Sequence, residues 1–292
     1  SADKTARVIR MLRAFSILLG AMTLFMVWQT LERVQGLNST LCFFLLSFIA
    51  FNPMWLFITS SVNNDNMVVF LTASMVYAFF LFWEKEMDLW SVCALGLLTG
   101  LALLAKQSAM IIIPSFLVTW GWIHKQRFHW KLESMVYLAS AGLVSGWWFV
   151  RNSILYSEIL AIRTHIDLAH NRRPAFDPFA LVKEWEGFVK SYWGVFGGFN
   201  IIFSEWIYYI FFGITFCLLV TALLFLGRHR HLISKAPFIF CFLLVFWNLV
   251  AVAIWTSRLW GSQGRLMFPS LSAQIVLLGL LLTGLNFRGL SW

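Results

Sequence analysis

Charge is scarce in this sequence. Charged residues make up 12% of the chain, and 13 of its 292 residues are acidic. Soluble globular domains carry roughly 25% charged residues. The shortage excludes an ordinary soluble globule, a disordered chain and a basic nucleic-acid-binding domain, so we expect no nucleic-acid partner.

Cysteine and the common catalytic motifs are also rare. The four cysteines lie inside apolar runs, which favours buried free thiols over disulfides or a metal site. The sequence has no phosphate-binding loop, nucleophile elbow, zinc signature or heptad repeat. Any function must therefore rest on polar residues placed between apolar segments.

Apolar residues dominate instead, at 60% of the chain, and they form long blocks. A membrane-spanning helix needs about 20 such residues, and backbone groups in lipid must be satisfied within the segment. We therefore predict an all-α, polytopic membrane protein with about nine transmembrane helices. The predicted spans are Ala14–Leu31, Leu41–Ser60, Asn66–Trp83, Ser91–Ala105, Ala109–Ile123, Ser134–Val150, Ile207–Leu226, Pro237–Trp255 and Phe268–Leu285.

Prolines and glycines modify this pattern. Pro53 and Pro114 should kink their runs or mark the ends of helices. Two Gly-x-x-x-Gly pairs, at Gly96/Gly100 and Gly142/Gly146, allow close helix packing.

The loops predict the orientation and the domain division. Most lysines and arginines of the loops lie on the side opposite the amino terminus, which makes that side cytoplasmic. The amino-terminal segment does not follow this bias, because it carries four basic residues on the predicted outer side, namely Lys4, Arg7, Arg10 and Arg13. We expect six spans in 1–150 after a basic juxtamembrane segment, a mainly helical extracytoplasmic cap in 151–206, and three spans in 207–292.

The first candidate site is the polar run from Ser60 to Asn66. Asp65 would lie at or just under the outer membrane surface, where an acid is costly and often functional. It could bind a divalent cation or position a sugar hydroxyl, with Asn63, Asn64 and Asn66 beside it. A loop whose Asn and Asp cap the next helix is an equally good interpretation.

Three cations form the second candidate. Lys106 lies between two apolar runs, and Arg258 and Arg265 flank a Gly- and Ser-containing loop. Lysine and arginine both bind phosphate, and arginine does so in a bidentate manner. Because all three face the side of Asp65, they favour a shared anionic ligand. Snorkelling or interfacial anchoring is the alternative.

Aromatic residues and glycines follow in 191–200, around Trp193, with Glu205 shortly after. Such a composition suits a sugar-binding surface, but a membrane-interface belt explains it better.

In order along the chain, these segments resemble a known superfamily. Phe51-Asn52-Pro53, Ser61–Asn66, and Gly100–Gln107 with its Lys106 are similar to multispanning GT-C glycosyltransferases. The resemblance is to the DUF2142-type, protein O-mannosyltransferase and aminoarabinose-transferase groups, and it runs from about Arg7 to Leu285. Three further segments fit the same groups, namely Arg151-Asn152 with Leu155-Tyr156, Trp193–Gly197, and Gln263–Pro269.

The resemblance implies an integral protein of a bacterial inner membrane that takes a sugar from a polyprenyl-phosphate carrier at the outer face. It implies that Lys106 and Arg265 hold the phosphate, and that Asp65 is a possible acid or a ligand of Mg²⁺ or Mn²⁺. Arg258 stays a candidate for the same phosphate because of its place in the loop. Glu205 is a distant second acid, and Arg151 belongs to the substrate loop. Membrane lipids are expected neighbours.

The sequence departs from the family in one respect. GT-C enzymes carry an essential acid in an outer loop after their first span, and this sequence starts after that loop. We therefore expect the longer protein to be an enzyme and this polypeptide alone to be inactive.

Two other functions compete with the enzyme. A non-catalytic subunit that binds a carrier lipid fits the absence of that acid. A transporter or flippase needs polar residues near the membrane midplane, and here those positions are almost wholly apolar.

Overall fold

The computed structural model describes residues 2–124, 129–169, 172–226 and 235–283. Helices dominate it, and one small antiparallel hairpin joins β1 (Val195–Phe196) to β2 (Ile201–Ile202). The helices are α1 (Ala2–Glu32), α2 (Ser39–Ala50), α3 (Pro53–Thr59), α4 (Asp65–Glu84), α5 (Leu89–Ala105), η1 (Gln107–Ile111), α6 (Ile112–His124), α7 (Trp130–Tyr156), α8 (Ile162–Leu168), α9 (Ala180–Lys183), α10 (Trp185–Trp193), α11 (Glu205–Leu226), α13 (Ala236–Thr256), η2 (Gly264–Ser270) and α14 (Leu271–Leu282).

The all-α membrane fold is confirmed, and within the described residues each predicted apolar run lies mainly on helical structure. Within the described ranges, four helical segments are long and apolar enough to cross a membrane, and a bent pair makes a fifth. The count of nine spans therefore stays a prediction. The orientation stays one too, because five of its basic residues lie outside the described residues. These are Lys125, Arg127, Arg228, Arg230 and Arg288.

The second predicted run is broken rather than continuous. α2 ends at Ala50, and Asn52 caps the start of α3, where its side-chain oxygen accepts a hydrogen bond from the Trp55 backbone N–H at 3.0 Å. Pro53 occupies the first turn of α3, where it needs no backbone donor. The two helices meet at 64° as a result. Leu41–Ser60 is thus a broken span or a re-entrant segment, with its bend at the proline.

The glycine pairs behave differently from each other. A Cβ on Gly96 or Gly100 of α5 would lie 2.5 or 2.7 Å from a backbone oxygen of α7. These glycines therefore permit the close packing of α5 on α7. Gly142 and Gly146 have nothing within 4 Å of an added Cβ, so the expectation of close packing there was wrong.

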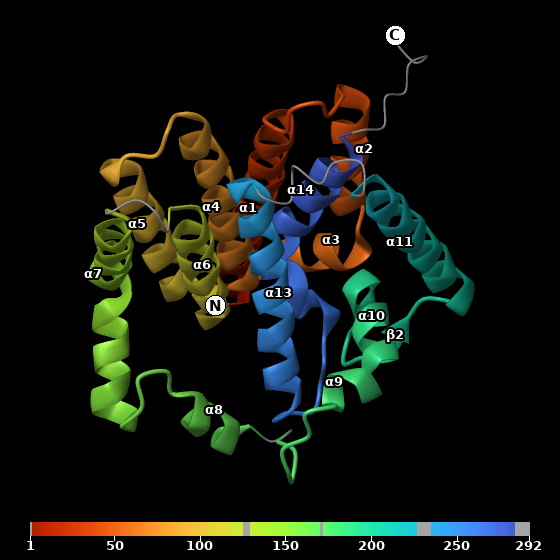
Figure 1. Ribbon diagram of the computed structural model, residues 1–292. Coiled ribbons are helices and arrows are strands. Elements are labelled where there is room, and N and C mark those ends of the chain that lie inside the picture. The colour runs from red at the N-terminus through yellow and green to blue at the C-terminus, as the bar shows by residue number, and fades with distance from the viewer. Residues whose placement is uncertain (1, 125–128, 170–171, 227–234, 284–292) are drawn as a thin grey trace.

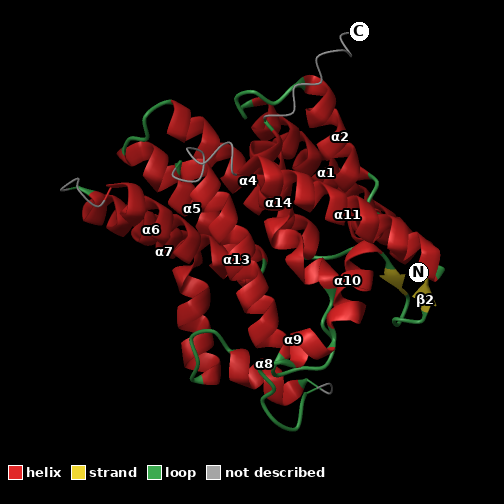
Figure 2. Ribbon diagram, turned by 45° about the vertical axis from the view of Figure 1, so that its right-hand side comes forward, coloured by secondary structure: helices red, strands yellow, loops and turns green. Residues whose placement is uncertain are grey.

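The core lies between the apolar helices, and the cap closes one end of the bundle. Phe79 of α4 stacks on Phe240 of α13 with ring centroids 4.2 Å apart, and Phe116 stacks on Tyr137 at 4.0 Å. The segment from the end of α7 through α8 and α9 passes beneath α13 in both views (Figures 1 and 2). The cap thereby covers the end of α13 that leads to η2.

Candidate functional site

The polar run before α4 is an ordered helix start. The side-chain oxygen of Asn63 accepts a hydrogen bond from the Asp65 backbone N–H at 2.9 Å. The carbonyl of Asn64 accepts from the Val68 N–H at 3.3 Å, within the first turn of the helix. The buried amide of Asn66 donates to two backbone carbonyls of the preceding turn, each at 3.1 Å. Together these bonds fix the position of the Asp65 carboxylate.

The structure joins two of the predicted candidates. Lys106 ends α5 in an extended conformation, and its ammonium forms an ion pair with the Asp65 carboxylate. The Asp65 side chain is 10% exposed and that of Lys106 is 28% exposed. Each charge therefore neutralises the other in a largely desolvated place. A phosphate at Lys106 would have to compete with Asp65.

A metal site at Asp65 finds little support in the side chains around it. In the described part of the chain, no group of three or more His, Cys, Asp or Glu side chains is arranged to hold a metal ion. The bound Lys106 ammonium also occupies a carboxylate oxygen that a cation would use. These donors do not fit a divalent cation.

Arg265 lies in a different place, on a pocket of about 70 Å³. Its side chain is half-buried, and its Nε donates to the Gln263 side-chain oxygen at 2.5 Å. Among the described residues it has no acidic partner, so its charge is uncompensated. The other lining residues are Met54, Phe57, Ser191, Val195, Gly197, Phe199 and Gln263. The pocket thus combines one cation that has no acidic partner among the described residues with a wall of apolar residues and the polar side chains of Ser191 and Gln263.

The site depends on a close approach of two elements. A Cβ on Gly264 would lie 2.3 Å from the Tyr192 backbone nitrogen and 2.4 Å from the Phe188 carbonyl oxygen. The Gly264 N–H also donates to the Ser191 hydroxyl at 2.8 Å. Only a residue without a side chain lets η2 pack this tightly on α10. Gly264 thereby brings Arg265 beside the hairpin.

The other predicted cations are not gathered with Arg265. The Arg258 guanidinium lies 4.8 Å from the centre of the Phe176 ring, in the cap. Arg151 lies 4.8 Å from the Trp148 ring, near the end of α7. Neither of them lines the Arg265 pocket, and neither does Lys106. The expectation of a single three-cation cluster is therefore not met in this pocket.

Two further candidates have structural partners instead. Trp193 is buried, and its ring stacks on Phe211 with centroids 4.5 Å apart. It holds α10 against α11 and presents no free face to a substrate. Glu205 begins α11 at the surface and forms an ion pair with Lys190 at 2.8 Å. Lys190 also forms an ion pair with Glu186 at 2.7 Å. Glu205 is not among the residues that line the Arg265 pocket.

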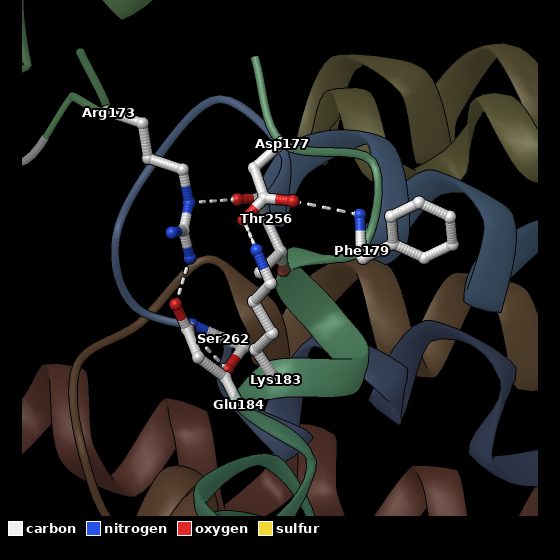
Figure 3. Close-up of polar contacts among 7 residues, drawn as sticks. All are labelled: Arg173, Asp177, Phe179, Lys183, Glu184, Thr256 and Ser262. Carbon is white, nitrogen blue, oxygen red and sulfur yellow. Dashed lines mark hydrogen bonds and ion pairs between the residues drawn. The ribbon is translucent and has the colours of Figure 1, made fainter. Parts of the chain in front are cut away.

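The cap contains an ion pair that the sequence pattern did not predict. Arg173 forms an ion pair with Glu184, and the arginine side chain is 6% exposed. Glu184 also accepts a hydrogen bond from the Ser262 hydroxyl at 2.7 Å, in the loop before Arg265 (Figure 3). In the sequence, Arg172, Arg173 and Glu184 are only charged residues of a polar segment, and their spacing does not show which of them pair.

A larger cavity lies elsewhere, between α1 and α2. It measures about 730 Å³ and is lined by apolar residues with Glu32 and Ser39. Its size is that of an ordinary ligand pocket, which spans roughly 300–1,000 Å³. Among the described residues that line it there is no lysine or arginine, and the one charged residue is acidic. A phosphate would be repelled there, so this cavity is a poor site for an anionic ligand.

Comparison with known proteins finds a similar family and a similar fold. Residues 5–148 match the profile of the family described as dolichyl-phosphate-mannose-protein mannosyltransferase. The structure is similar to the crystal structure of ArnT from Cupriavidus metallidurans bound to undecaprenyl phosphate, with a TM-score of 0.61 and 14% identity. The match covers 94% of this chain and 46% of that one. A search of curated proteins found no match.

Proposed function

We propose that this chain, a member of the GT-C superfamily of membrane glycosyltransferases, binds the phosphate of a polyprenyl-phosphate sugar carrier through Arg265. The supporting observation is a guanidinium without an acidic partner among the described residues, on a pocket whose wall is partly apolar. Arginine matches phosphate oxygens with a planar fork of donors. The small pocket suits a phosphate group, while apolar surface nearby receives the first isoprene units.

The proposed reaction is transfer of the sugar to an acceptor at the outer face of a bacterial inner membrane, in the synthesis or modification of the cell envelope. As the bond between sugar and phosphate breaks, negative charge grows on the leaving phosphate. A fixed guanidinium stabilises that charge without reorganising at the moment of reaction. Arg265 would thereby serve both binding and leaving-group stabilisation. Lys106 would join it only by exchanging Asp65 for phosphate.

A second candidate function is that of a carrier-binding, non-catalytic subunit. It is favoured by one observation, since no acidic residue is found among the described residues that line the Arg265 pocket. Both functions use the same phosphate site. Sugar transfer by the longer protein, measured with a radiolabelled polyprenyl-phosphate sugar, distinguishes them.

The location of the carrier can be tested by photolabelling. We expect a polyprenyl phosphate with a diazirine in its first isoprene unit to label peptides that contain residues 197–199 and 263–266. Peptide mass spectrometry after irradiation in nanodiscs measures this. A matched probe that ends in a hydroxyl, in place of the phosphate, should label these peptides several-fold less.

Labelling confined to residues 28–46, around the larger cavity, would contradict the proposal. So would equal labelling of 263–266 by the phosphate and hydroxyl probes, because the guanidinium would then play no part in recognition.

A further inference from the structure

The loop that leads from α13 to Arg265 is held largely by the cap. Five backbone groups between Thr256 and Gly264 bond to cap residues, three as acceptors and two as donors. The bonds are Arg173 Nε to Thr256 O at 2.7 Å, Asp177 N to Ser257 O at 3.1 Å, Arg173 N to Arg258 O at 2.8 Å, Ser262 N to Glu184 Oε2 at 3.2 Å, and Gly264 N to Ser191 Oγ at 2.8 Å.

Arg173 is the centre of this contact. Figure 3 shows its guanidinium between the Thr256 carbonyl and the Glu184 carboxylate. The same guanidinium lies 3.9 Å from the centre of the Trp260 ring. One buried side chain therefore contacts the beginning and the middle of the loop. Its planar guanidinium donates to the Thr256 carbonyl and to the Glu184 carboxylate at the same time, and a lysine ammonium does not reproduce this geometry.

Glu184 connects Arg173 to the later part of the loop. One carboxylate oxygen pairs with Arg173, and the other accepts from the backbone N–H and the hydroxyl of Ser262. Burial alone would raise the pKa of Glu184, but the hydrogen bonds from Ser262 and the charge of Arg173 outweigh it and lower the pKa. The carboxylate is thus held in its charged form.

Without these partners the loop would be free to move. Residues 257–263 contain no regular secondary structure, and Gly261 has a φ of +109°. Fixing each such residue costs on the order of 1–2 kcal/mol of conformational entropy. Arg265 lies two residues after this loop, at the start of η2, so the loop and the packing of η2 on α10 together set the position of its guanidinium.

We propose that Arg173 and Glu184 are positioning residues that orient Arg265 for a phosphate. Together with Ser262, which Glu184 binds, these residues are called the cap latch. The proposal rests on the proposed function, because it assigns to the cap the preorganisation of that same phosphate site. A preorganised site binds more tightly since less ordering remains to be done on binding. The cap latch acts through Arg265 and need not touch the ligand.

The test compares Arg173→Lys with Arg172→Lys in the full chain in nanodiscs. Arg172 is the neighbouring arginine, and its ion pair with Asp167 is exposed, at 2.9 Å. The probes are farnesyl phosphate and farnesol, which differ only in the phosphate. Binding is titrated by tryptophan fluorescence, and hydrogen exchange of the peptide 257–266 is measured on the same samples.

We expect Arg173→Lys to lower the affinity for farnesyl phosphate about 5- to 20-fold and to leave farnesol binding unchanged. Exchange of the 257–266 amides should accelerate at least about tenfold, while Arg172→Lys matches the wild type in both readouts. Glu184→Gln, which keeps the shape but removes the charge, should give a smaller change in the same direction. Glu184→Gln also replaces Arg173→Lys in the test if Arg173→Lys does not fold.

The inference is overturned if Arg265→Ala removes the preference for farnesyl phosphate while both cap-latch variants keep it. It is also overturned if a cap-latch variant weakens both ligands equally, because the role would then be general stability. A wild type that binds the two ligands equally well would overturn the proposed function itself, which separates the two failures.

Discussion

Gly264→Ala is expected to separate η2 from α10 and to destroy the phosphate site. The new methyl group would meet the Tyr192 backbone nitrogen at 2.3 Å and the Phe188 carbonyl oxygen at 2.4 Å. Backbone atoms cannot rotate away as a side chain can, so one element must shift. We expect a loss of about 2–4 kcal/mol in the free energy of unfolding, as for other severely overpacked sites. Binding of farnesyl phosphate should fall by more than about tenfold.

The matched control is Gly142→Ala. Gly142 lies within α7 and has nothing within 4 Å of an added Cβ. Alanine is also the better helix former, by up to about 1 kcal/mol. Unfolding in mixed micelles should therefore show Gly142→Ala at or above wild-type stability. Equal stabilities for the two variants would contradict the close approach of η2 to α10.

The second large effect concerns the ion pair between Asp65 and Lys106. Removing either charge leaves the other unpaired in a mostly buried place, which costs about 3–5 kcal/mol when burial is complete. We expect about 2–4 kcal/mol for Asp65→Asn or Lys106→Met, since the Lys106 side chain is 28% exposed. The double variant should recover part of this loss, because no lone charge remains.

A double-mutant cycle measures the coupling directly. The exposed pair Asp167–Arg172, with both side chains more than half exposed, provides the comparison. Its coupling should be about 0–1 kcal/mol, as for surface pairs in general. A coupling of the buried pair no larger than that of the exposed pair would show that Asp65 and Lys106 do not interact as described.

The sequence predicted the helices better than it predicted the site. Long apolar runs carry the fold, because lipid leaves the backbone no other partner than its own helix. Pro53 predicted the break between α2 and α3, since its ring prevents continuation. The hairpin of Val195–Phe196 with Ile201–Ile202 was not expected. Its strands have two residues each, too few for an alternating pattern to be seen.

Asp65, Lys106 and Arg265 were each found as polar residues among apolar neighbours. Their partners were not, because pairing depends on how the helices pack. Asp65 and Lys106 are 41 residues apart, and Arg173 reaches Thr256 across 83 residues. Trp193 was a candidate for a sugar-binding surface on composition alone, whereas its burial against Phe211 is a tertiary property.

The central claim is that Arg265 recognises the phosphate of a polyprenyl carrier. The most direct measurement is the ratio of affinities for farnesyl phosphate and farnesol in wild type, Arg265→Ala and Arg163→Ala, where Arg163 is an exposed arginine of the cap. A charge-assisted hydrogen bond of about 1.5–3 kcal/mol predicts that Arg265→Ala lowers the ratio roughly 10- to 100-fold. Arg163→Ala should leave it unchanged. An unchanged ratio in Arg265→Ala would contradict the account.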